Sequence, residues 1–434
     1  MLIRDSLSHE ASSRSAVTIV TNQFTLVDQW CQTLLFRRLA RLGEGRLTIA
    51  DGGNQWQFGQ GGGPVAYVRV LDRRFYREAT INGSLGAGEA YLRGWWTTDD
   101  LTSLFRLFLR NLDVMDAMET GMARVGLALA QRLHSLHKNS LEGSRENIHA
   151  HYDLGNDFFR LFLDETMSYS AGIYADSGTT LLEASIAKID RLCRKLDLQP
   201  GDHLLEIGTG WGAFAIHAAR HYGCRVTTTT ISDQQYEVAR ERIFEEGLEN
   251  RITPLREDYR NLRGQFDKLV SVEMIEAVGR EFLPTYLGQC CRLLKPNGLM
   301  ALQGILMADH RYGRYCKRVD FIQRYVFPGS HLPSLGALTQ AMAAETDFTL
   351  SHLEDITPYY SRTLRDWRER FLTRLGEVRG LGYPESFIRL WNYYLCYCEA
   401  GFEERNILNV QVLLSRTGSR REPVLGNLSG QCAT

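Results

Sequence analysis

From about residue 180 onward, the chain alternates between segments with helical spacing of apolar residues and short apolar runs typical of buried strands. Helices are predicted at 180–196, 213–222, 233–246 and 282–294, and strands around Leu204 and at 225–230, 267–272, 299–306 and 407–416. Such alternation is typical of an α/β fold with a doubly wound parallel sheet. Ligands in these sheets bind at the carboxyl ends of the strands, where Glu206, Thr230 and Glu273 are predicted to lie.

Before this region, the pattern predicts a small N-terminal α/β domain over residues 1–110. Strands are expected at 47–51 and 65–70, separated by a flexible glycine-rich stretch at 59–63, and a helix is expected at 99–112. The remainder of the chain, residues 146–434, is predicted to form the doubly wound domain.

Between these two domains, residues 111–145 show the apolar spacing of a long amphipathic helix. The apolar positions of this helix are Met115, Met118, Met122, Val125, Leu129 and Leu133. Two interpretations remain open. The helix is either a linker packed on a core or a membrane-facing element, the latter supported by the basic cluster of His134, His137 and Lys138.

Composition narrows the class of protein. The 434 residues are 44% hydrophobic and carry a formal net charge of −1, so no overall field attracts nucleic acid. Nine cysteines are scattered along the chain: the lack of a Cys-x-x-Cys pair argues against a zinc site, and the odd number argues against a disulfide framework. The polar N-terminus lacks the apolar core of a signal peptide, and no run approaches the roughly 20 apolar residues of a membrane span. A cytoplasmic protein with at most peripheral membrane contact is expected.

The strongest local signal is residues 203–212, HLLEIGTGWG, where a short strand ending at Glu206 runs into glycines at alternate positions. Gly208, Gly210 and Gly212 allow a tight turn and close approach of a ligand, and the next helix begins near Ala213 with free N–H groups. The spacing differs from the dinucleotide-binding Gly-x-Gly-x-x-Gly and from a phosphate loop. A turn without any ligand is the alternative.

Several segments together resemble one protein family. Residues 203–212 resemble the first motif of S-adenosylmethionine-dependent methyltransferases. Further segments resemble the cyclopropane-fatty-acyl-phospholipid synthases and related fatty-acid methyltransferases: 151–159 (HYDLGNDFF), 167–170 (MSYS), 230–235 (TISDQQ), 272–279 (VEMIEAVG), 320–329 (DFIQRYVFPG) and 332–334 (LPS). The resemblance spans about 145–416. It implies a Rossmann-like class I methyltransferase domain with a helical acyl-binding insertion.

The resemblance also implies a set of cofactor-binding residues for S-adenosylmethionine. They are Tyr169, Ser170, Glu206, Gly208, Gly210, Thr230, Gln235, Asp258 and Tyr259. Many methyltransferases end the second strand with an acidic residue that holds the ribose. Here the strand ends in threonines, so Gln235 is expected to supply part of that contact. For the threonines other than Thr230, an ordinary β-branched strand is the alternative.

The reaction implied is methyl transfer from the sulfonium to the cis double bond of an acyl chain, followed by proton loss and closure of a cyclopropane ring. The carbocation formed on the way requires a base in a pocket that excludes water. By resemblance, Glu276 is the catalytic glutamate that helps to hold a bicarbonate acting as this base, and Tyr360 and Cys398 are further catalytic positions. The alternatives are a solvated loop glutamate and a buried apolar cysteine.

Two residues depart from the best-known members of the family. Ala171 stands where they carry cysteine, and Gln303 stands where they carry histidine. Glutamine can hydrogen-bond an anion but cannot carry a proton, whereas Ala171 still offers its backbone N–H. Gln303 is therefore a fourth catalytic candidate, and either a weakened bicarbonate site or a different base is expected.

The acyl chain needs an apolar wall, which is expected in an insertion at about 311–381. Apolar residues there are Phe321, Tyr325, Phe327, Leu332, Leu335 and Leu338, preceded by Tyr312, Tyr315 and the basic Arg311, Arg314, Lys317 and Arg318. An aromatic and basic surface suits anionic phospholipid head groups, and a solvated helical face is the alternative. The expected partners are unsaturated phospholipid chains at the inner face of the membrane, without nucleic acid, and a homodimer is left open.

Two other functions are considered. The same methyl transfer can end in a methylene or methyl-branched chain that a separate reductase completes. Alternatively, Ala171 and Gln303 can mark a non-catalytic lipid-binding protein on a methyltransferase fold. A dinucleotide oxidoreductase conflicts with the spacing of the glycine loop.

Overall fold

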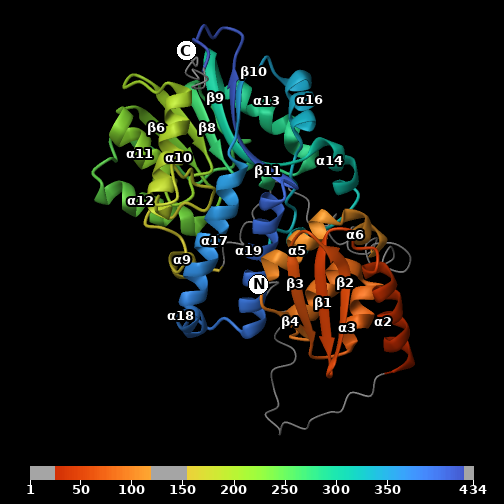
Figure 1. The fold of residues 1–434 in the computed structure, drawn as a ribbon. Coiled ribbons are helices and arrows are strands. Elements are labelled where there is room, and N and C mark those ends of the chain that lie inside the picture. The colour runs from red at the N-terminus through yellow and green to blue at the C-terminus, as the bar shows by residue number, and fades with distance from the viewer. Residues whose placement is uncertain (1–24, 119–153, 425–434) are drawn as a thin grey trace, which may run out of the picture. The chain divides into compact units, whose positions relative to one another are not determined.

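The computed structural model describes residues 25–118 and 154–424 (Figure 1). The chain divides into two compact units, which are described separately. The N-terminal unit comprises Met1–Phe162, His310–Gly329 and Tyr360–Ile407, and the central-sheet unit comprises Leu163–Asp309, Ser330–Tyr359 and Leu408–Thr434. The domain boundaries at 110 and 145 stay a prediction. Within the described residues, no helix combines the length and the apolarity that a bilayer span requires.

The N-terminal unit contains a four-stranded sheet in the order β2-β1-β3-β4. The strands β1 (Gly45–Asp51) and β3 (Val65–Val70) pair in parallel, whereas β2 (Asn54–Gly61) and β4 (Trp96–Thr98) pair antiparallel with β1 and β3, respectively. The predicted flexible stretch at 59–63 therefore overlaps a strand. At Gly59, an added Cβ would lie 2.3 Å from the carbonyl oxygen of Gly45, so glycine allows β2 to approach β1.

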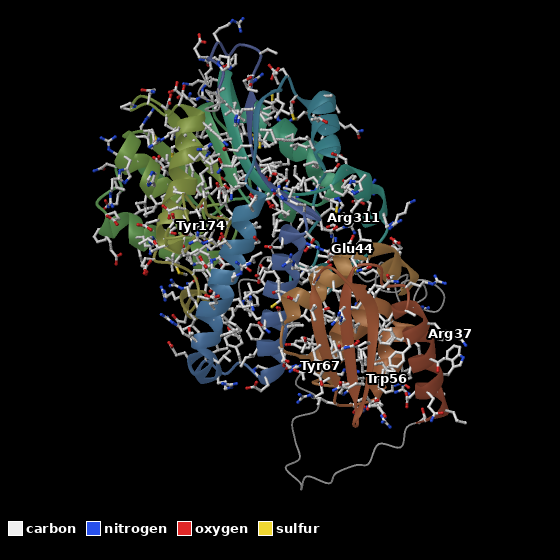
Figure 2. All side chains as sticks on the ribbon, viewed as in Figure 1. Arg37, Glu44, Trp56, Tyr67, Tyr174 and Arg311 are labelled. Atoms are coloured by element: carbon white, nitrogen blue, oxygen red, sulfur yellow. The ribbon has the colours of Figure 1, made fainter. Side chains whose placement is uncertain are left out.

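Helices complete the N-terminal unit. They are α2 (Leu26–Leu39), α3 (Arg74–Ile81), α4 (Gly83–Leu92), α5 (Leu101–Arg110), α6 (Leu112–Met118), α9 (Asn156–Arg160), α14 (Asp309–Tyr315), α15 (Phe321–Tyr325), α17 (Thr357–Thr373), α18 (Leu375–Gly380) and α19 (Glu385–Glu403). Figure 2 labels Trp56 of β2 and Tyr67 of β3 on the sheet. Side chains from the sheet, α5 and α19 line an apolar cavity of about 110 Å³.

Only the first turns of the predicted helix at 111–145 fall among the described residues, as α6. Met122, Val125, Leu129, Leu133 and the basic cluster of His134, His137 and Lys138 lie outside them. The linker and membrane-facing interpretations therefore both stay predictions.

The central-sheet unit is built on seven strands in the order β10-β11-β9-β8-β5-β6-β7. These are β5 (His203–Ile207), β6 (Arg225–Thr229), β7 (Ile252–Leu255), β8 (Phe266–Val272), β9 (Leu294–Met307), β10 (Thr349–Asp355) and β11 (Ile407–Ser415). The pairs β5–β6, β6–β7, β5–β8 and β8–β9 are parallel, and β10–β11 is antiparallel. The prediction of a doubly wound α/β domain with a mainly parallel sheet is confirmed.

Helices cover both faces of this sheet, with α10, α11 and α12 on one face and α13 and α16 on the other (Figure 1). Their bounds, with two short 3₁₀ turns, are α10 (Leu181–Leu196), α11 (Ala213–Tyr222), α12 (Asp233–Glu245), η2 (Ile275–Ala277), η3 (Arg280–Phe282), α13 (Leu283–Leu293) and α16 (Leu335–Glu345). Two edge strands were not predicted. β7 has four residues and includes Pro254, and β10 alternates exposed with half-buried residues inside the predicted insertion.

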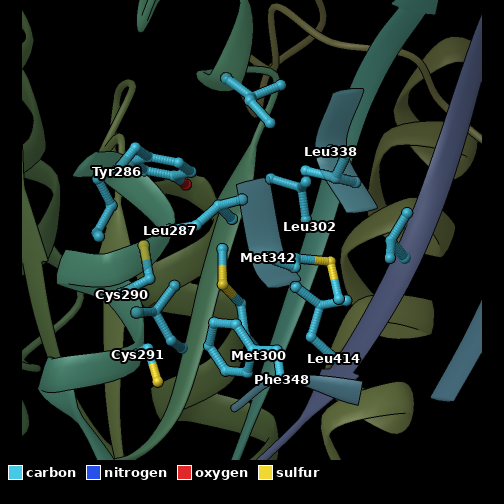
Figure 3. Packing of buried hydrophobic residues seen from close by; sticks show 14 of the residues in the cluster. Tyr286, Leu287, Cys290, Cys291, Met300, Leu302, Leu338, Met342, Phe348 and Leu414 are labelled. Atoms are coloured by element: carbon cyan, nitrogen blue, oxygen red, sulfur yellow. The ribbon is translucent and has the colours of Figure 1, made fainter. Parts of the chain in front are cut away.

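The core on one face of the sheet fixes its central strands. Figure 3 shows Tyr286, Leu287 and Cys290 of α13 packed beside Met300 and Leu302 of β9. A second cluster, which includes Leu192, Ala215, Leu204 and Ala301, covers the opposite face. Because the central strands are buried on both faces, they appear as continuous apolar runs in the sequence.

Candidate active site

The glycine loop leaves the carboxyl end of β5, which lies between β6 and β8, where the order of the strands reverses. All three glycines have positive φ angles, at 104° for Gly208, 52° for Gly210 and 86° for Gly212. A Cβ added to Gly210 would meet no atom within 4 Å, whereas one added to Gly212 would lie 3.3 Å from the Cβ of Ala239. Gly210 therefore borders open space at the position where such sheets bind ligands.

Glu206 lies beneath this loop. Its side chain is 3% exposed and accepts a hydrogen bond of 2.6 Å from the hydroxyl of Thr228. Burial raises the pKa of Glu206 to about 8, and the Thr228 hydrogen bond and the charge of Lys188 offset this only in part. The carboxyl group is thus held inside the sheet layer. Its assignment to the cofactor stays a prediction.

The structure brings Thr230 and Gln235 together, as the predicted cofactor site requires. The Thr230 hydroxyl donates to Gln235 Oε1 at 2.9 Å, and the Ser232 side chain caps α12 by accepting from the Gln235 N–H. The three preceding threonines bond within the fold: Thr227 to His203, Thr228 to Glu206 and Thr229 to the carbonyl of Glu257. Of this run, Thr228 and Thr230 bond to predicted cofactor residues, Glu206 and Gln235 respectively.

Asp258 and Tyr259 follow β7. Arg260, which the sequence did not single out, donates to both carboxylate oxygens of Asp258, at 2.8 and 2.7 Å. The ring of Tyr259 meets that of Tyr286 edge-on at 5.2 Å, and burial raises the pKa of Tyr259. Both residues are fixed by neighbours within the central-sheet unit.

Ser170 contacts a buried lysine that sequence reasoning missed. Lys188 of α10 is 3% exposed and donates to Ser170 Oγ at 2.8 Å. Burial lowers the pKa of Lys188, and the charges of Glu273, Asp164 and Glu206 act in the opposite direction. A lysine on the apolar face of an amphipathic helix was the signal available, because such positions are rarely charged without a partner.

Glu273, directly after β8, has a carboxylate that binds three other segments of the chain. Its Oε1 accepts from the Ala171 backbone N–H at 3.0 Å, from Gln303 Nε2 at 2.9 Å and from Asn409 Nδ2 at 2.8 Å. Its backbone has a φ of 48°, in the left-handed region that non-glycine residues rarely adopt. The sequence indicated its place at a strand end but gave it no role.

Gln303, on β9, connects Glu273 to a buried row of polar side chains. Gln303 is 0% exposed, and its amide also donates to the Ala171 carbonyl at 3.2 Å. Its Oε1 accepts from Gln411 at 2.9 Å, and Gln411 accepts in turn from Lys195 at 2.8 Å. Burial lowers the pKa of Lys195 to about 8, although this lysine pairs with Glu354. The structure thus shows Gln303 holding Glu273, and a direct catalytic role stays a prediction.

Glu276 lies on the 3₁₀ turn η2. Its Oε1 accepts from the Ile305 N–H, whereas Oε2 is buried and accepts no hydrogen bond from the described residues. Burial raises the pKa of Glu276 well above its ordinary value, and the neighbouring charge of Glu273 raises it further. Oε2 is therefore buried rather than solvated, and this environment favours the protonated acid.

The other two predicted catalytic residues belong to the N-terminal unit. Tyr360 of α17 is 6% exposed and stacks on Phe402 with ring centroids 4.3 Å apart. Cys398 lies on α19, and burial raises the pKa of its thiol, which favours the uncharged form. Their roles in catalysis stay predictions.

The basic residues of the predicted insertion also lie in the N-terminal unit. Arg314 and Arg318 both bond to Asp116 of α6, the latter at 3.0 Å. Arg311, labelled in Figure 2, is half-buried on α14. Two of the four cations proposed for phospholipid head groups thus already have an acidic partner.

Comparison with known proteins identifies the family of this chain. The mycolic acid cyclopropane synthetase family matches residues 139–412. The chain is 38% identical to the tuberculostearic acid methyltransferase UfaA1 of Mycobacterium tuberculosis, over 80% of this chain and 82% of the relative. It is 36% identical to the cyclopropane-fatty-acyl-phospholipid synthase of Escherichia coli, over 82% and 89% of the two chains.

Solved structures show the same fold. The cyclopropane synthase MmaA2 of M. tuberculosis aligns with a TM-score of 0.59 and 30% identity, covering 62% of this chain and 98% of that one. The mycolic acid cyclopropane synthase CmaA1, complexed with SAH and CTAB, aligns with a TM-score of 0.58 and 31% identity over the same shares. The extent and identity of these matches confirm the predicted relationship. This chain belongs to the mycolic acid cyclopropane synthetase family and is an enzyme with a class I methyltransferase fold.

Proposed function

We propose that the enzyme transfers the methyl group of S-adenosylmethionine to the cis double bond of unsaturated phospholipid acyl chains, forming cyclopropane fatty acids. One observation carries this proposal. A glycine loop that borders open space at Gly210 lies in the same unit as two carboxyl groups, Glu273 and Glu276, at the end of the adjacent strand β8. The names of two relatives, a cyclopropane-fatty-acyl-phospholipid synthase and a tuberculostearic acid methyltransferase, support the substrate class.

The residues at the end of β5 fit S-adenosylmethionine, which supplies an electrophilic methyl group on a sulfonium. Gly208 and Gly210 would let the ligand approach the backbone closely, because neither residue has a side chain in the way. Gln235, oriented by Thr230, would bond its polar groups. The SAH bound to CmaA1, a relative with the same fold, is consistent with this assignment.

Two products are compatible with this site, and they differ in what happens after methyl transfer. Loss of a proton with ring closure gives the cyclopropane, and a 1,2-hydride shift followed by loss of a proton from the new methyl group gives a methylene chain. The second product is favoured by one observation, namely the similarity to an enzyme named tuberculostearic acid methyltransferase. In both cases the enzyme must exclude water from the cation and provide a base.

Labelled methyl transfer tests the proposal. The purified enzyme is incubated with vesicles of unsaturated phospholipid and S-adenosylmethionine carrying a deuterated methyl group, and the fatty-acid esters are analysed by mass spectrometry before and after hydrogenation. We expect esters one methylene group heavier that resist hydrogenation. A heavier ester that takes up hydrogen indicates the methylene product instead. Absence of label from the lipid contradicts the proposed function.

Acyl chains of phospholipids are buried in the bilayer, so the enzyme must work at a membrane surface. We propose a peripheral association with the cytoplasmic face, for which anionic head groups would supply attraction. Co-sedimentation with vesicles with and without anionic lipid measures this association, and equal binding to both contradicts the electrostatic part.

A further inference from the structure

The donors expected to hold a bicarbonate do not fit that role in this chain. The Ala171 backbone N–H donates to Glu273 Oε1 at 3.0 Å. The Gln303 amide donates to the same oxygen at 2.9 Å and to the Ala171 carbonyl at 3.2 Å. A glutamine amide has only two hydrogens, so these contacts use both of them. An external anion would have to displace a carboxylate of the protein itself.

We propose that the Glu273 carboxylate is the base that removes the proton after methyl transfer, in the position where an external bicarbonate was expected. This inference rests on the proposed function, because it assigns a residue to the last step of that reaction. It deepens the function by making the base a part of the chain.

The geometry around Glu273 supports this role. Its carboxylate is anchored by donors from three separate segments: Ala171 from the loop before α10, Gln303 from β9 and Asn409 from β11. Several donors on one oxygen fix the direction of the whole group, as a catalytic base requires. The left-handed backbone at Glu273, with a φ of 48°, costs free energy that surrounding contacts must sustain, and such strain concentrates at functional sites.

Glu273 also lies beside the loop proposed to hold the methyl donor. A Cβ added to Gly208 would come within 3.4 Å of the Cβ of Met274, the residue that follows Glu273. In the sheet, β8 is the neighbour of β5 on the side opposite β6. A methyl group presented at the end of β5 would therefore be close to the chain at the end of β8.

The two glutamates of this turn have different environments. Glu273 Oε1 accepts from three N–H groups that come from separate segments of the chain. Glu276 accepts from a single N–H, and burial together with the charge of Glu273 raises its pKa. Of the two carboxyl groups, Glu273 is therefore the one whose orientation is fixed by several donors, and Glu276 is the one whose burial favours the protonated acid.

The step balances with the groups named. The double bond supplies an electron pair to the methyl carbon while the carbon–sulfur bond breaks, which leaves S-adenosylhomocysteine and a carbocation on the acyl chain. A C–H bond of the new methyl group then breaks, and its electron pair closes the ring onto the cationic carbon. For the methylene product, a 1,2-hydride shift first moves the cation to the carbon that carries the new methyl group, and the electron pair of the methyl C–H bond then forms the double bond. The proton passes to the Glu273 carboxylate, so no oxidant, reductant or further reactant is needed.

Dependence on bicarbonate is the sharpest test, because it needs no variant. In carbonate-free buffer under argon, the wild-type enzyme should transfer labelled methyl groups to vesicle lipid at full rate, and added bicarbonate should change that rate less than about twofold. A rate that requires bicarbonate overturns the inference but leaves the proposed function intact. If no label reaches the lipid under either condition, the proposed function fails and the inference fails with it.

Variants then locate the base. Glu273→Gln should lower the rate at least about 100-fold, the usual contribution of a general base. In addition, unreacted cation should be captured by water, giving hydroxylated acyl products. Glu273→Gly should regain activity when bicarbonate or formate is added. The control Glu281→Gln removes an exposed acid on the nearby turn η3 and should change neither rate nor products.

Calorimetric binding of S-adenosylhomocysteine shows whether each variant has folded. A folded Glu273→Gln enzyme with wild-type rate and products overturns the inference.

Discussion

The two sides of the candidate site are built in different ways. The cofactor side is a contiguous loop, Gly208 to Gly212, whose shape follows from glycines with positive φ angles. The other side is a network in which Glu273 binds Ala171, Gln303 and Asn409, residues separated from it by 102, 30 and 136 positions. The loop therefore depends on local backbone conformation, whereas the network exists only when distant strands have assembled.

Substitutions on the two sides of the site should therefore affect different kinetic quantities. Changes in the loop should weaken binding of the methyl donor, since they alter the shape of the cradle. Changes in the network should lower the rate of the chemical step, since they disturb the orientation of a carboxylate.

The largest effect is expected from Gln303→Leu, which removes the side chain that holds Glu273. We expect kcat to fall about 100-fold with little change in the KM for S-adenosylmethionine, because the base loses its orientation. Steady-state kinetics with labelled methyl groups measures both constants. Ser271→Ala is the control: Ser271 lies on β8, and the substitution removes a buried hydrogen bond of 2.9 Å to the Ile207 carbonyl on β5. An unchanged kcat in the Gln303→Leu enzyme would show that the hydrogen bonds to Glu273 do not contribute to the chemical step.

A smaller effect, on binding, is expected from Gly208→Ala. Alanine is strained at a φ of 104°, so affinity for S-adenosylhomocysteine should fall about 10- to 100-fold, corresponding to about 1–3 kcal/mol. Titration calorimetry measures the affinity. Gly247→Ala is a matched control, since Gly247 also has a positive φ of 63° and open space around an added Cβ, but lies between α12 and β7. Equal loss of affinity in both variants would contradict a specific role for the loop.

Thr230→Val tests whether the orientation of Gln235 contributes to cofactor binding. The substitution removes the hydrogen bond of 2.9 Å that orients Gln235, and the affinity for S-adenosylhomocysteine should fall about 3- to 10-fold. Thr227→Val removes a comparable hydrogen bond, of 2.9 Å to His203, and should leave affinity unchanged. The same titration distinguishes the two threonines, and equal effects would exclude a specific contribution of Thr230.

The smallest effect at neutral pH is expected from Glu206→Gln, which replaces a largely protonated acid by a neutral isostere. The folded pKa is about 8, above the ordinary 4.5, so the folded state binds more protons between these values. Wild-type stability should therefore fall as pH rises through this window. The variant lacks this pH-dependent contribution. The Tm of the variant minus the Tm of the wild type should therefore increase from pH 5 to pH 9. If the Tm values of variant and wild type changed with pH in parallel, the raised pKa of Glu206 would be contradicted.

Much of the central-sheet unit was predictable, because its strands and helices carry strong local patterns. The apolar runs of β5, β8 and β9, the glycine loop and the capped helix α10 are local signals. The edge strands β7 and β10 were missed, since an edge strand is stabilised by pairing with its neighbour rather than by its own apolar residues. Glycine-rich β2 was missed for the same reason.

The predicted site residues illustrate the same limit. Thr230 directly follows β6 and Gln235 lies in the first turn of α12, so they are only five positions apart and their pairing follows from local geometry. Arg260 beside Asp258, Lys188 beside Ser170 and Glu273 beside Gln303 were not recognised. The last two contacts join residues from different elements, which no spacing along the chain reveals.

The sequence by itself determined the family, the doubly wound fold and the glycine loop, because these depend on patterns over short stretches of chain. Only the tertiary structure decided what Ala171 and Gln303 mean. In the sequence, these two residues replace the cysteine and the histidine of an expected anion site. In the fold, the N–H groups of both residues donate to Glu273 Oε1. A buried hydrogen bond is a property of positions in space, so the carboxylate that satisfies these donors emerges only after β8, β9 and β11 have packed together.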